Sequence, residues 1–190
     1  AVGVGKEQAN QIHVYFGVQY HAIIMIVKQS QRYLVNFVKY HIALGFDRFI
    51  IYDNDDVGAE GHEQVLIDAK INPRYYKVIR FPGNSFQNGI QHWMLSDFLR
   101  RVQQNRDQDK DYDSNIFFKG ITHHMQIDVD EFIVLKKHSN IKEFIADYFQ
   151  GHCGGITMNW RYFGSCGQKK YSKVPSSLCL LWFPPKGQCI

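Results

Sequence analysis

Hydrophobic and polar residues follow two different patterns along this chain, and the alternation of these patterns predicts alternating strands and helices. Residues 20–27 (YHAIIMIV) form a nearly continuous apolar run of strand length, as expected for a strand covered on both faces. From residue 31 the apolar residues recur every three or four positions, which is typical of an amphipathic helix, and Gly45 marks its end. The same reasoning predicts strands at 47–52, 75–81, 125–132 and 154–163, and helices at 60–71, 87–104 and 140–150.

This alternation of strands and helices predicts an α/β fold in which a mostly parallel sheet is flanked by helices. In such a fold, ligands bind beyond the carboxyl ends of the strands. The helix predicted at 87–104 should turn its apolar side chains toward the sheet, and we expect these to be Ile90, Trp93, Met94 and Phe98.

Composition and charge narrow the class of protein. Of the 190 residues, 45% are hydrophobic, so we expect one domain over 1–190, with 1–18 as a lead-in and 168–190 as an irregular tail. The net charge is only +4 and no Lys/Arg-rich run occurs, which predicts no nucleic-acid partner. No apolar run approaches the roughly 18 residues of a membrane span, and residues 1–18 lack a signal-peptide pattern.

The candidate chemistry centres on Asp128 and Asp130, which end an apolar, β-branched run. In an extended strand these two side chains would share one face with Gln126, with their Cα atoms roughly 7 Å apart. One divalent cation fits between carboxylates at that spacing, and hard cations such as Mg²⁺ and Mn²⁺ prefer oxygen ligands. The alternative interpretation is a solvated strand end.

Polar residues also follow two other predicted strands. Lys28 follows strand 20–27, and Asp53 and Asn54 follow strand 47–52, so both groups should meet the Asp-X-Asp pair at one edge of a parallel sheet. Lys28 could face a phosphate, and Asp53 or Asn54 could hydrogen-bond a base or ribose. The alternatives are a solvated strand end for Lys28 and an Asn/Asp-rich turn after strand 47–52.

His123 and His124 come just before the acidic pair, but adjacent residues on a strand point to opposite faces and are poorly placed to bind one zinc ion. Trp160 falls in an aromatic strand and could be a core residue or could stack on a sugar ring.

Between residues 20 and 167 the chain carries motifs that are specific in combination. They are Lys28, Tyr33-Leu34, Tyr40-His41, Gly45-Phe46-Asp47, Ile51-Tyr52-Asp53-Asn54-Asp55, Gln91, Ile127-Asp128-Val129-Asp130-Glu131-Phe132, Trp160 and Phe163-Gly164-Ser165-Cys166-Gly167. With these motifs the chain resembles glycosyltransferase family 92 and its family-2-like relatives.

The resemblance implies a GT-A fold, a nucleoside-diphosphate sugar donor with UDP-sugars favoured, and inversion at the sugar carbon. The acceptor would be a hydroxyl of a glycan or glycoprotein. A Mn²⁺ or Mg²⁺ ion would be held by Asp130, the direct ligand, together with Asp128. Matching positions place Lys28, Asp53, Asn54, Gln91 and Asp128 near the donor, and Trp160 near the sugars.

The chain departs from the family pattern at Gln29-Ser30, where the family has Asn-Glu, and at Asn36-Phe37, where it has Glu-Trp. In addition, no Asp or Glu follows Asp147, although an inverting transfer needs a base for the acceptor hydroxyl. Glu131 and His152 are the candidates within this chain.

Two other functions therefore stay open: a non-catalytic nucleotide-sugar-binding module, and a metal-dependent phosphohydrolase. The phosphohydrolase would need a nucleophilic Asp at the end of the first strand, where Lys28 stands. The expected location is cytoplasmic if the domain is soluble and unanchored, and the Golgi lumen if it belongs to a longer anchored protein, as in eukaryotic relatives.

Overall fold

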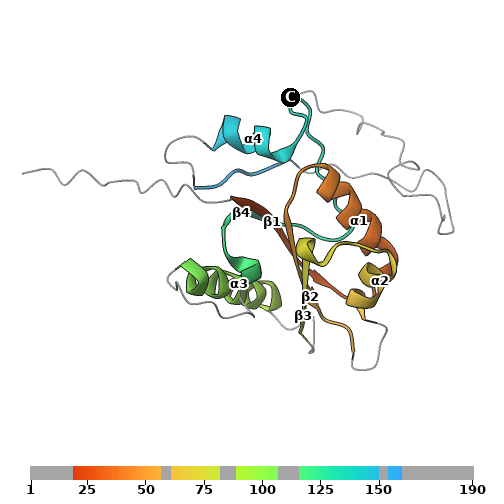
Figure 1. Cartoon of the computed structure of the whole chain (residues 1–190). Helices are drawn as coiled ribbons and strands as arrows, with labels where there is room; N and C mark the ends of the chain where they lie inside the picture. The colour runs from red at the N-terminus through yellow and green to blue at the C-terminus, as the bar shows by residue number, and fades with distance from the viewer. Residues whose placement is uncertain (1–18, 57–60, 82–88, 107–115, 150–153, 160–190) are drawn as a thin grey trace, which may run out of the picture.

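The fold was described from a computed structural model, which describes residues 19–56, 61–81, 89–106, 116–149 and 154–159. Strands and helices alternate along the chain (Figure 1). The elements are β1 (Tyr20–Val27), α1 (Gln31–Ala43), β2 (Arg48–Asp53), α2 (His62–Asp68), β3 (Tyr76–Arg80), α3 (Ile90–Arg106), β4 (Ile121–Gln126) and α4 (Ile141–Tyr148), with short 3-10 helices at Pro73–Tyr75 and Ile116–Phe118.

The four strands form one sheet in the order β3-β2-β1-β4, and every neighbouring pair is parallel. This confirms the predicted α/β fold with a parallel sheet flanked by helices. The chain moves outward from β1 to β2 and β3, then returns to place β4 on the other side of β1. The strand order therefore reverses between β1 and β4, and ligands of open α/β sheets bind at such a reversal.

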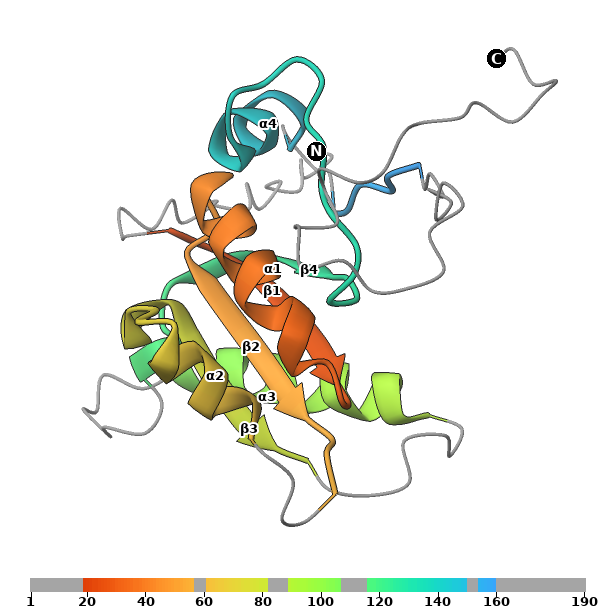
Figure 2. The same cartoon turned by 90° about the vertical axis from the view of Figure 1, so that its right-hand side faces the viewer.

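Alternate residues of the strands build two cores, one on each face of the sheet. Ile23, Met25 and Ile51 pack under α1 and α2, whereas Ile24 and Tyr52 pack under α3. Figure 2 shows α1 and α2 in front of the sheet and α3 behind it. Crossovers between parallel strands are right-handed, so α3 comes to the opposite face when the strand order reverses.

A buried carboxylate fixes α3 to the sheet. Asp97 accepts a hydrogen bond from the Tyr52 hydroxyl (3.0 Å) and another from Arg101 Nε (2.6 Å), and it also pairs with Arg100. Burial beside Asp97 raises the pKa of the Tyr52 phenol, so this hydroxyl stays a donor.

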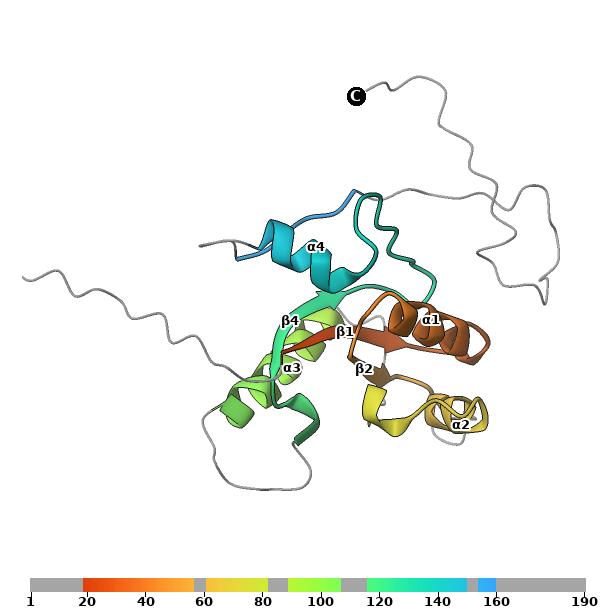
Figure 3. The ribbon, with the colours of Figure 1, turned by 45° about the horizontal axis from the view of Figure 1, so that its top comes forward.

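Helix α4 joins the α1 side of the sheet. Ile141 is buried in the same core as Leu34 and Phe37, and Figure 3 shows α4 and α1 on one side of β1 and β4. The Ile141 amide donates to the Leu44 carbonyl (2.9 Å). Gly45 has φ +102°, a left-handed conformation that favours glycine, and this explains the predicted glycine stop; a Cβ there would meet Ile141 at 3.5 Å, an ordinary contact distance.

Three predictions need correction. Trp93 is 59% exposed, because the inward stripe of α3 is Met94, Phe98 and Val102, and Trp93 lies one residue, about 100°, around the helix from it. The strand expected at 125–132 ends at Gln126, where a turn begins. The strand expected at 154–163 does not appear over 154–159, which are exposed and irregular after two glycines; 160–163 lie outside the described residues.

The lead-in 1–18 and the tail 168–190 also lie outside the described residues. Within the residues that are described, no helix has the length and apolar character needed to cross a membrane.

Candidate functional site

The carboxyl ends of β1, β2 and β4 share one edge of the sheet, as their parallel pairing requires. The Asn54 amide donates a hydrogen bond to the Val27 carbonyl (2.9 Å), which holds the chain after β2 beside the end of β1 and hence beside Lys28. Asp128 and Asp130 follow β4 at the same edge. The topology thus brings the three predicted polar clusters to one side of the molecule.

Asp128 and Asp130 lie in a tight turn rather than in a strand. The Glu131 amide donates to the Asp128 carbonyl (3.0 Å), and the Glu131 carboxylate accepts from the Asp128 amide (2.9 Å). Ile127 and Val129 are buried in the core under α1, whereas Asp128 and Asp130 are exposed. The apolar residues therefore anchor the turn and leave both carboxylates on the outside, as the alternation predicted.

Helix α1 holds the segment that follows this turn. The Tyr40 hydroxyl donates to the Ile133 carbonyl (2.8 Å), and the Ile133 amide donates to His41 Nε2 (3.4 Å). His41 Nδ1 in turn donates to the Phe37 carbonyl (2.9 Å). Burial lowers the pKa of His41 to about 4, even though the bond to Phe37 acts in the opposite direction, so His41 is a neutral acceptor at neutral pH.

A cavity of about 280 Å³ lies beside the acidic turn, at the point where the strand order reverses. It joins the tip of β1, the start of α1 and the turn after β4. Its walls are Ile26, Ser30, Tyr33, Asp128, Val129 and Asp130.

The two carboxylates at this cavity repel each other. Although the Asp128 side chain reaches solvent, the cavity wall partly desolvates it, and this burial, followed by the Asp130 charge, raises the pKa of Asp128 above its ordinary value. Within the described residues, no Lys, Arg or His side chain forms an ion pair with either carboxylate. Both features favour a cation between them.

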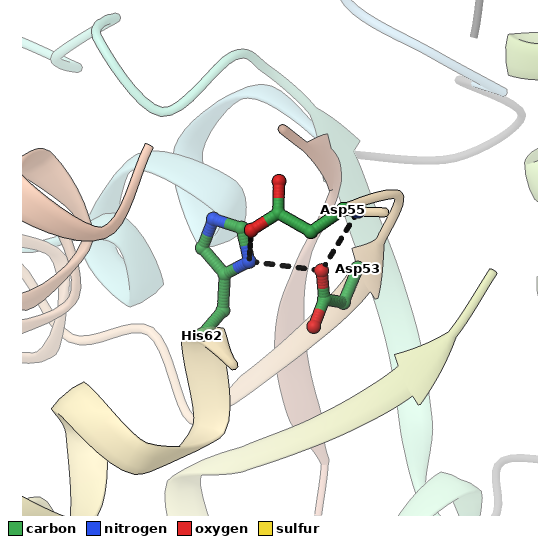
Figure 4. A group of neighbouring side chains, drawn as sticks. All are labelled: Asp53, Asp55 and His62. Atoms are coloured by element: carbon green, nitrogen blue, oxygen red, sulfur yellow. Dashed lines mark hydrogen bonds and ion pairs between the residues drawn. The ribbon is translucent and has the colours of Figure 1, made fainter. Parts of the chain in front are cut away.

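A second acidic cluster lies at the end of β2. It consists of Asp53, Asp55 and His62, and all three side chains are buried (Figure 4). His62 Nδ1, from the start of α2, lies 2.9 Å from Asp53 Oδ1 and 3.4 Å from Asp55 Oδ2. Arg80 donates to Asp53 Oδ2 (2.7 Å), and the Asp55 amide donates to Asp53 Oδ1 (3.1 Å). Burial alone would raise the pKa of Asp53, but these hydrogen bonds outweigh it and hold that pKa below its ordinary value.

Asp55 fixes the turn between β1 and α1. Its carboxylate accepts hydrogen bonds from the Gln29 amide (2.6 Å) and from the side-chain amide of Gln31 (2.6 Å). Gln29 has φ +51°, a left-handed conformation that non-glycine residues rarely adopt, so external bonds are needed to hold it. Ser30, in the same turn, lines the cavity, so the buried cluster shapes one wall of it.

Asp53, Asp55 and His62 could also hold a metal ion, because their donor atoms lie within 4.8 Å of one another. The hydrogen bonds favour a different role. The Ser30 amide donates to His62 Nε2 (3.3 Å), which places the ring proton on Nδ1, the atom that faces the carboxylates. A metal on Nδ1 would move that proton to Nε2, against the Ser30 N–H. We therefore interpret this group, here called the His62 clamp, as a hydrogen-bonded support.

The remaining predicted site residues are less closely grouped. Lys28 Nζ lies 3.5 Å from Asp56 Oδ1 at the protein surface, and the Asn54 side-chain amide donates to the Phe81 carbonyl (2.6 Å), which ties β2 to the end of β3. Gln91 is exposed on the first turn of α3 and does not line the cavity. Trp160 and His152 lie outside the described residues.

The two adjacent histidines of β4 point to opposite faces, as predicted. His123 stacks on His21 with ring centroids 5.4 Å apart, whereas His124 packs on Phe98 at 5.0 Å on the α3 side. Burial lowers the pKa of both rings, so neither is a cationic partner for the acidic turn.

Sequence reasoning did not identify His62 and Arg80 as partners of Asp53. Asp55 was part of the Asn/Asp-rich cluster that the sequence marked as a turn, but its role in holding Gln29 was not foreseen. A His at the first position of a helix and an Arg at the end of a strand carry no pattern of their own. Their roles appear only when α2 and β3 are placed beside β2.

The described residues form an α/β protein whose parallel sheet bears two acidic clusters at its carboxyl edge. No family model matches the chain, and no curated protein gave a significant match to its sequence. The resemblance to glycosyltransferases therefore stays a hypothesis, to be weighed against the geometry of the site.

Proposed function

We propose that this chain is a metal-dependent glycosyltransferase of the GT-A type. It would move a sugar from a nucleoside-diphosphate sugar, with UDP-sugars favoured, to a hydroxyl of a glycan or glycoprotein, with inversion at the sugar carbon. The observation that supports this most is the position of Asp128 and Asp130 beside a cavity at the reversal of strand order.

The acidic turn fits a hard divalent cation. Asp128 and Asp130 have no cationic partner among the described residues, so their oxygens are available as ligands. They would supply only part of the coordination shell of an ion. Mn²⁺ and Mg²⁺ commonly take one or two carboxylates from the protein and complete their shell with phosphate oxygens and water. When bound, the ion would neutralise the diphosphate as it leaves. Asp130 and Asp128 would hold it there.

The other cavity residues suit a nucleotide sugar. Ile26 and Tyr33 supply apolar wall for a base or sugar ring, and the Ser30 backbone is held in place by its bond to His62. Lys28 stands two residues before Ser30 in the turn after β1, and its ammonium group, which lies 3.5 Å from Asp56, could contact a phosphate. The His62 clamp would act as a positioning group, because it orders the turn that carries Lys28 and Ser30.

One observation favours a second candidate, the non-catalytic nucleotide-sugar-binding module. The Glu131 carboxylate is already bound to the Asp128 amide (2.9 Å), so its evident role is to hold the turn rather than to accept a proton from an acceptor hydroxyl. His152, the other base candidate, lies outside the described residues.

The test is calorimetric titration of UDP in the presence of Mn²⁺ into the wild-type chain and two variants. Asp130→Asn removes one charge of the acidic turn, and Asp68→Asn is the matched control on the exposed side of α2. We expect binding by the wild type and the control, and its loss in Asp130→Asn or in EDTA. Absent binding, or binding that ignores both Mn²⁺ and Asp130, would contradict the proposal.

A second measurement separates the two candidates. UDP release from a panel of UDP-sugars, in water and with mono- and disaccharide acceptors, should depend on Asp130 if the chain is a transferase. Intact UDP binding with no release from any donor would instead assign the chain to the binding-module class.

A further inference from the structure

Trp93 is the large apolar side chain on α3 that is most exposed, yet it is held in a fixed place. Its side chain is 59% exposed, and its ring packs against Phe81 with centroids 4.8 Å apart and planes inclined by 33°. Phe81 in turn contacts the buried ring of Tyr52 edge-on at 5.9 Å. An exposed indole supported by two further rings presents a rigid apolar surface to solvent.

The indole lies at the same edge of the sheet as the acidic turn. Phe81 directly follows the carboxyl end of β3, and Figure 2 shows the first turns of α3 at the end of the sheet to which the strand arrows point. Helical side chains lean toward the N-terminus of their helix, which directs Trp93 toward the first turn of α3. Among the described residues, a Cβ at Gly89 would meet nothing within 4 Å.

Polar side chains follow Trp93 along the same side of α3. Ser96 and Arg100 follow Trp93 at three and seven residues, hence on the same side of α3, and both are exposed. Arg100 is paired with Asp97, which orients its guanidinium. A flat apolar face with polar side chains along the same side of the helix matches a pyranose ring, which has an apolar C–H face and a rim of hydroxyl groups; the Ser96 hydroxyl donates to the His92 carbonyl (2.9 Å) and keeps its acceptor capacity.

Within the residues that the structure describes, this aromatic surface is too small for a stable protein interface. A Phe and a Trp side chain offer about 150–250 Å² each when fully covered, whereas a stable interface buries about 800 Å² per partner. Leu99, the other exposed large apolar residue of α3, lies about 120° around the helix from Trp93 and more than one turn further along, so the two do not form one patch. The observations therefore favour a single small ring as the ligand.

The sheet also connects this surface to the cavity. Ile26, which lines the cavity, pairs with Tyr52 across β1 and β2, and Tyr52 contacts Phe81. Two strand spacings, about 10 Å, separate β1 from β3. A ring on Trp93 and a group in the cavity would thus lie within reach of one short oligosaccharide.

We propose that Phe81 and Trp93 form a stacking platform for a sugar ring of the acceptor glycan, on the α3 side of the donor cavity. As an acceptor site, the platform rests on the proposed glycosyltransferase function. Its binding of glycans can be tested apart from that function, because stacking needs neither metal nor nucleotide.

The experiment titrates four tetrasaccharides into the full chain without metal or nucleotide: chitotetraose, cellotetraose, maltotetraose and lacto-N-neotetraose. We expect at least one to bind in the millimolar range, with Trp93→Ala weakening binding about tenfold and Trp93→Phe weakening it less. Leu99→Ala, which truncates another exposed apolar side chain of the same helix (46% exposed), should leave the affinity unchanged. UDP binding with Mn²⁺ should be the same in Trp93→Ala as in the wild type.

Two results would overturn the platform: no tetrasaccharide binds the wild type at about 10 mM, the range expected for one stacked ring, or binding is the same after Trp93→Ala. A change of sedimentation coefficient in Trp93→Ala without any change in glycan affinity would also overturn it, by assigning Trp93 to a contact between copies of the chain. Glycan binding that depends on Trp93, in a chain that fails to bind UDP, would keep the platform and remove the glycosyltransferase.

Discussion

At the carboxyl edge of the sheet, Asp53 and Asp55 are buried and bonded to His62, Arg80 and the turn after β1, whereas Asp128 and Asp130 are exposed beside a cavity. The two clusters contain the same residue type and lie at ends of strands that flank β1 on either side. In the first, hydrogen bonds lower the pKa of Asp53; in the second, burial and a like charge raise the pKa of Asp128. The hydrogen-bond and ion-pair partners of the carboxylates, rather than the residue type, distinguish the buried support from the proposed metal site.

The largest effect should come from breaking the His62 clamp. Asp53→Ala leaves buried His62 with only its longer contact to Asp55 (3.4 Å) and removes the ion pair with Arg80, so we expect the free energy of unfolding to fall by about 3–5 kcal/mol. Urea denaturation followed by circular dichroism measures this. Asp68→Ala, an exposed acid of α2, should change stability by less than about 0.5 kcal/mol. A loss below about 1 kcal/mol in Asp53→Ala would mean that the clamp is not a support.

The second effect concerns the histidine that holds the segment after the acidic turn. The folded pKa of His41 is about 4, below the ordinary value of 6.5, so the unfolded chain binds more protons between these values. Stability should therefore fall as the pH drops from 6.5 to 4, by up to about 1.4 kcal/mol per pH unit.

Thermal unfolding of wild type and His41→Gln across that pH range measures this contribution. His41→Gln should show a flatter dependence, whereas His92→Gln, at an exposed position of α3, should follow the wild type. If stability falls equally steeply with pH in the wild type and in His41→Gln, groups other than His41 cause the pH dependence of stability.

At the acidic turn we expect a smaller pH dependence of stability, opposite in sign to that of His41. Because the pKa of Asp128 is raised in the folded state, the folded protein loses stability as the pH rises from the unfolded to the folded pKa of this carboxyl. Asp128→Asn should then increase the free energy of unfolding at pH 7 by less than about 1 kcal/mol, while Mn²⁺-dependent UDP binding weakens at least about tenfold. Clear destabilisation by Asp128→Asn would assign the turn a structural role like that of the clamp.

The smallest effect should be that of Glu131→Gln. The glutamine can still accept the Asp128 amide hydrogen, though without the charge, so we expect a loss of about 0.5–1 kcal/mol and unchanged UDP binding. UDP release from UDP-sugars measures its chemical role. A fall of about a hundredfold in release, with binding intact, would identify Glu131 as the base and contradict its assignment to the turn.

Periodicity was sufficient to predict the alternating elements and the parallel sheet, because each buried strand and each apolar helix face leaves a local pattern. It also placed Lys28, Asn54 and Asp130 at one edge, since parallel strands share their carboxyl ends. It could not predict the His62 clamp, which joins three elements through hydrogen bonds. It misplaced Trp93, because neighbouring apolar residues on a helix do not reveal which of them centres the buried stripe.

The strand order also sets when each part of the site can form. Ala22 pairs with Arg48 nearby in sequence, whereas Tyr20 pairs with the distant Ile121, and closing the longer loop is the slower event. We expect pulse-labelling hydrogen exchange to show β2 protected before β4. The His62 clamp, at the end of β2, would then form early in folding, and the acidic turn, after β4, would form late. A metal ion at Asp128 and Asp130 would recognise only chains that have finished folding.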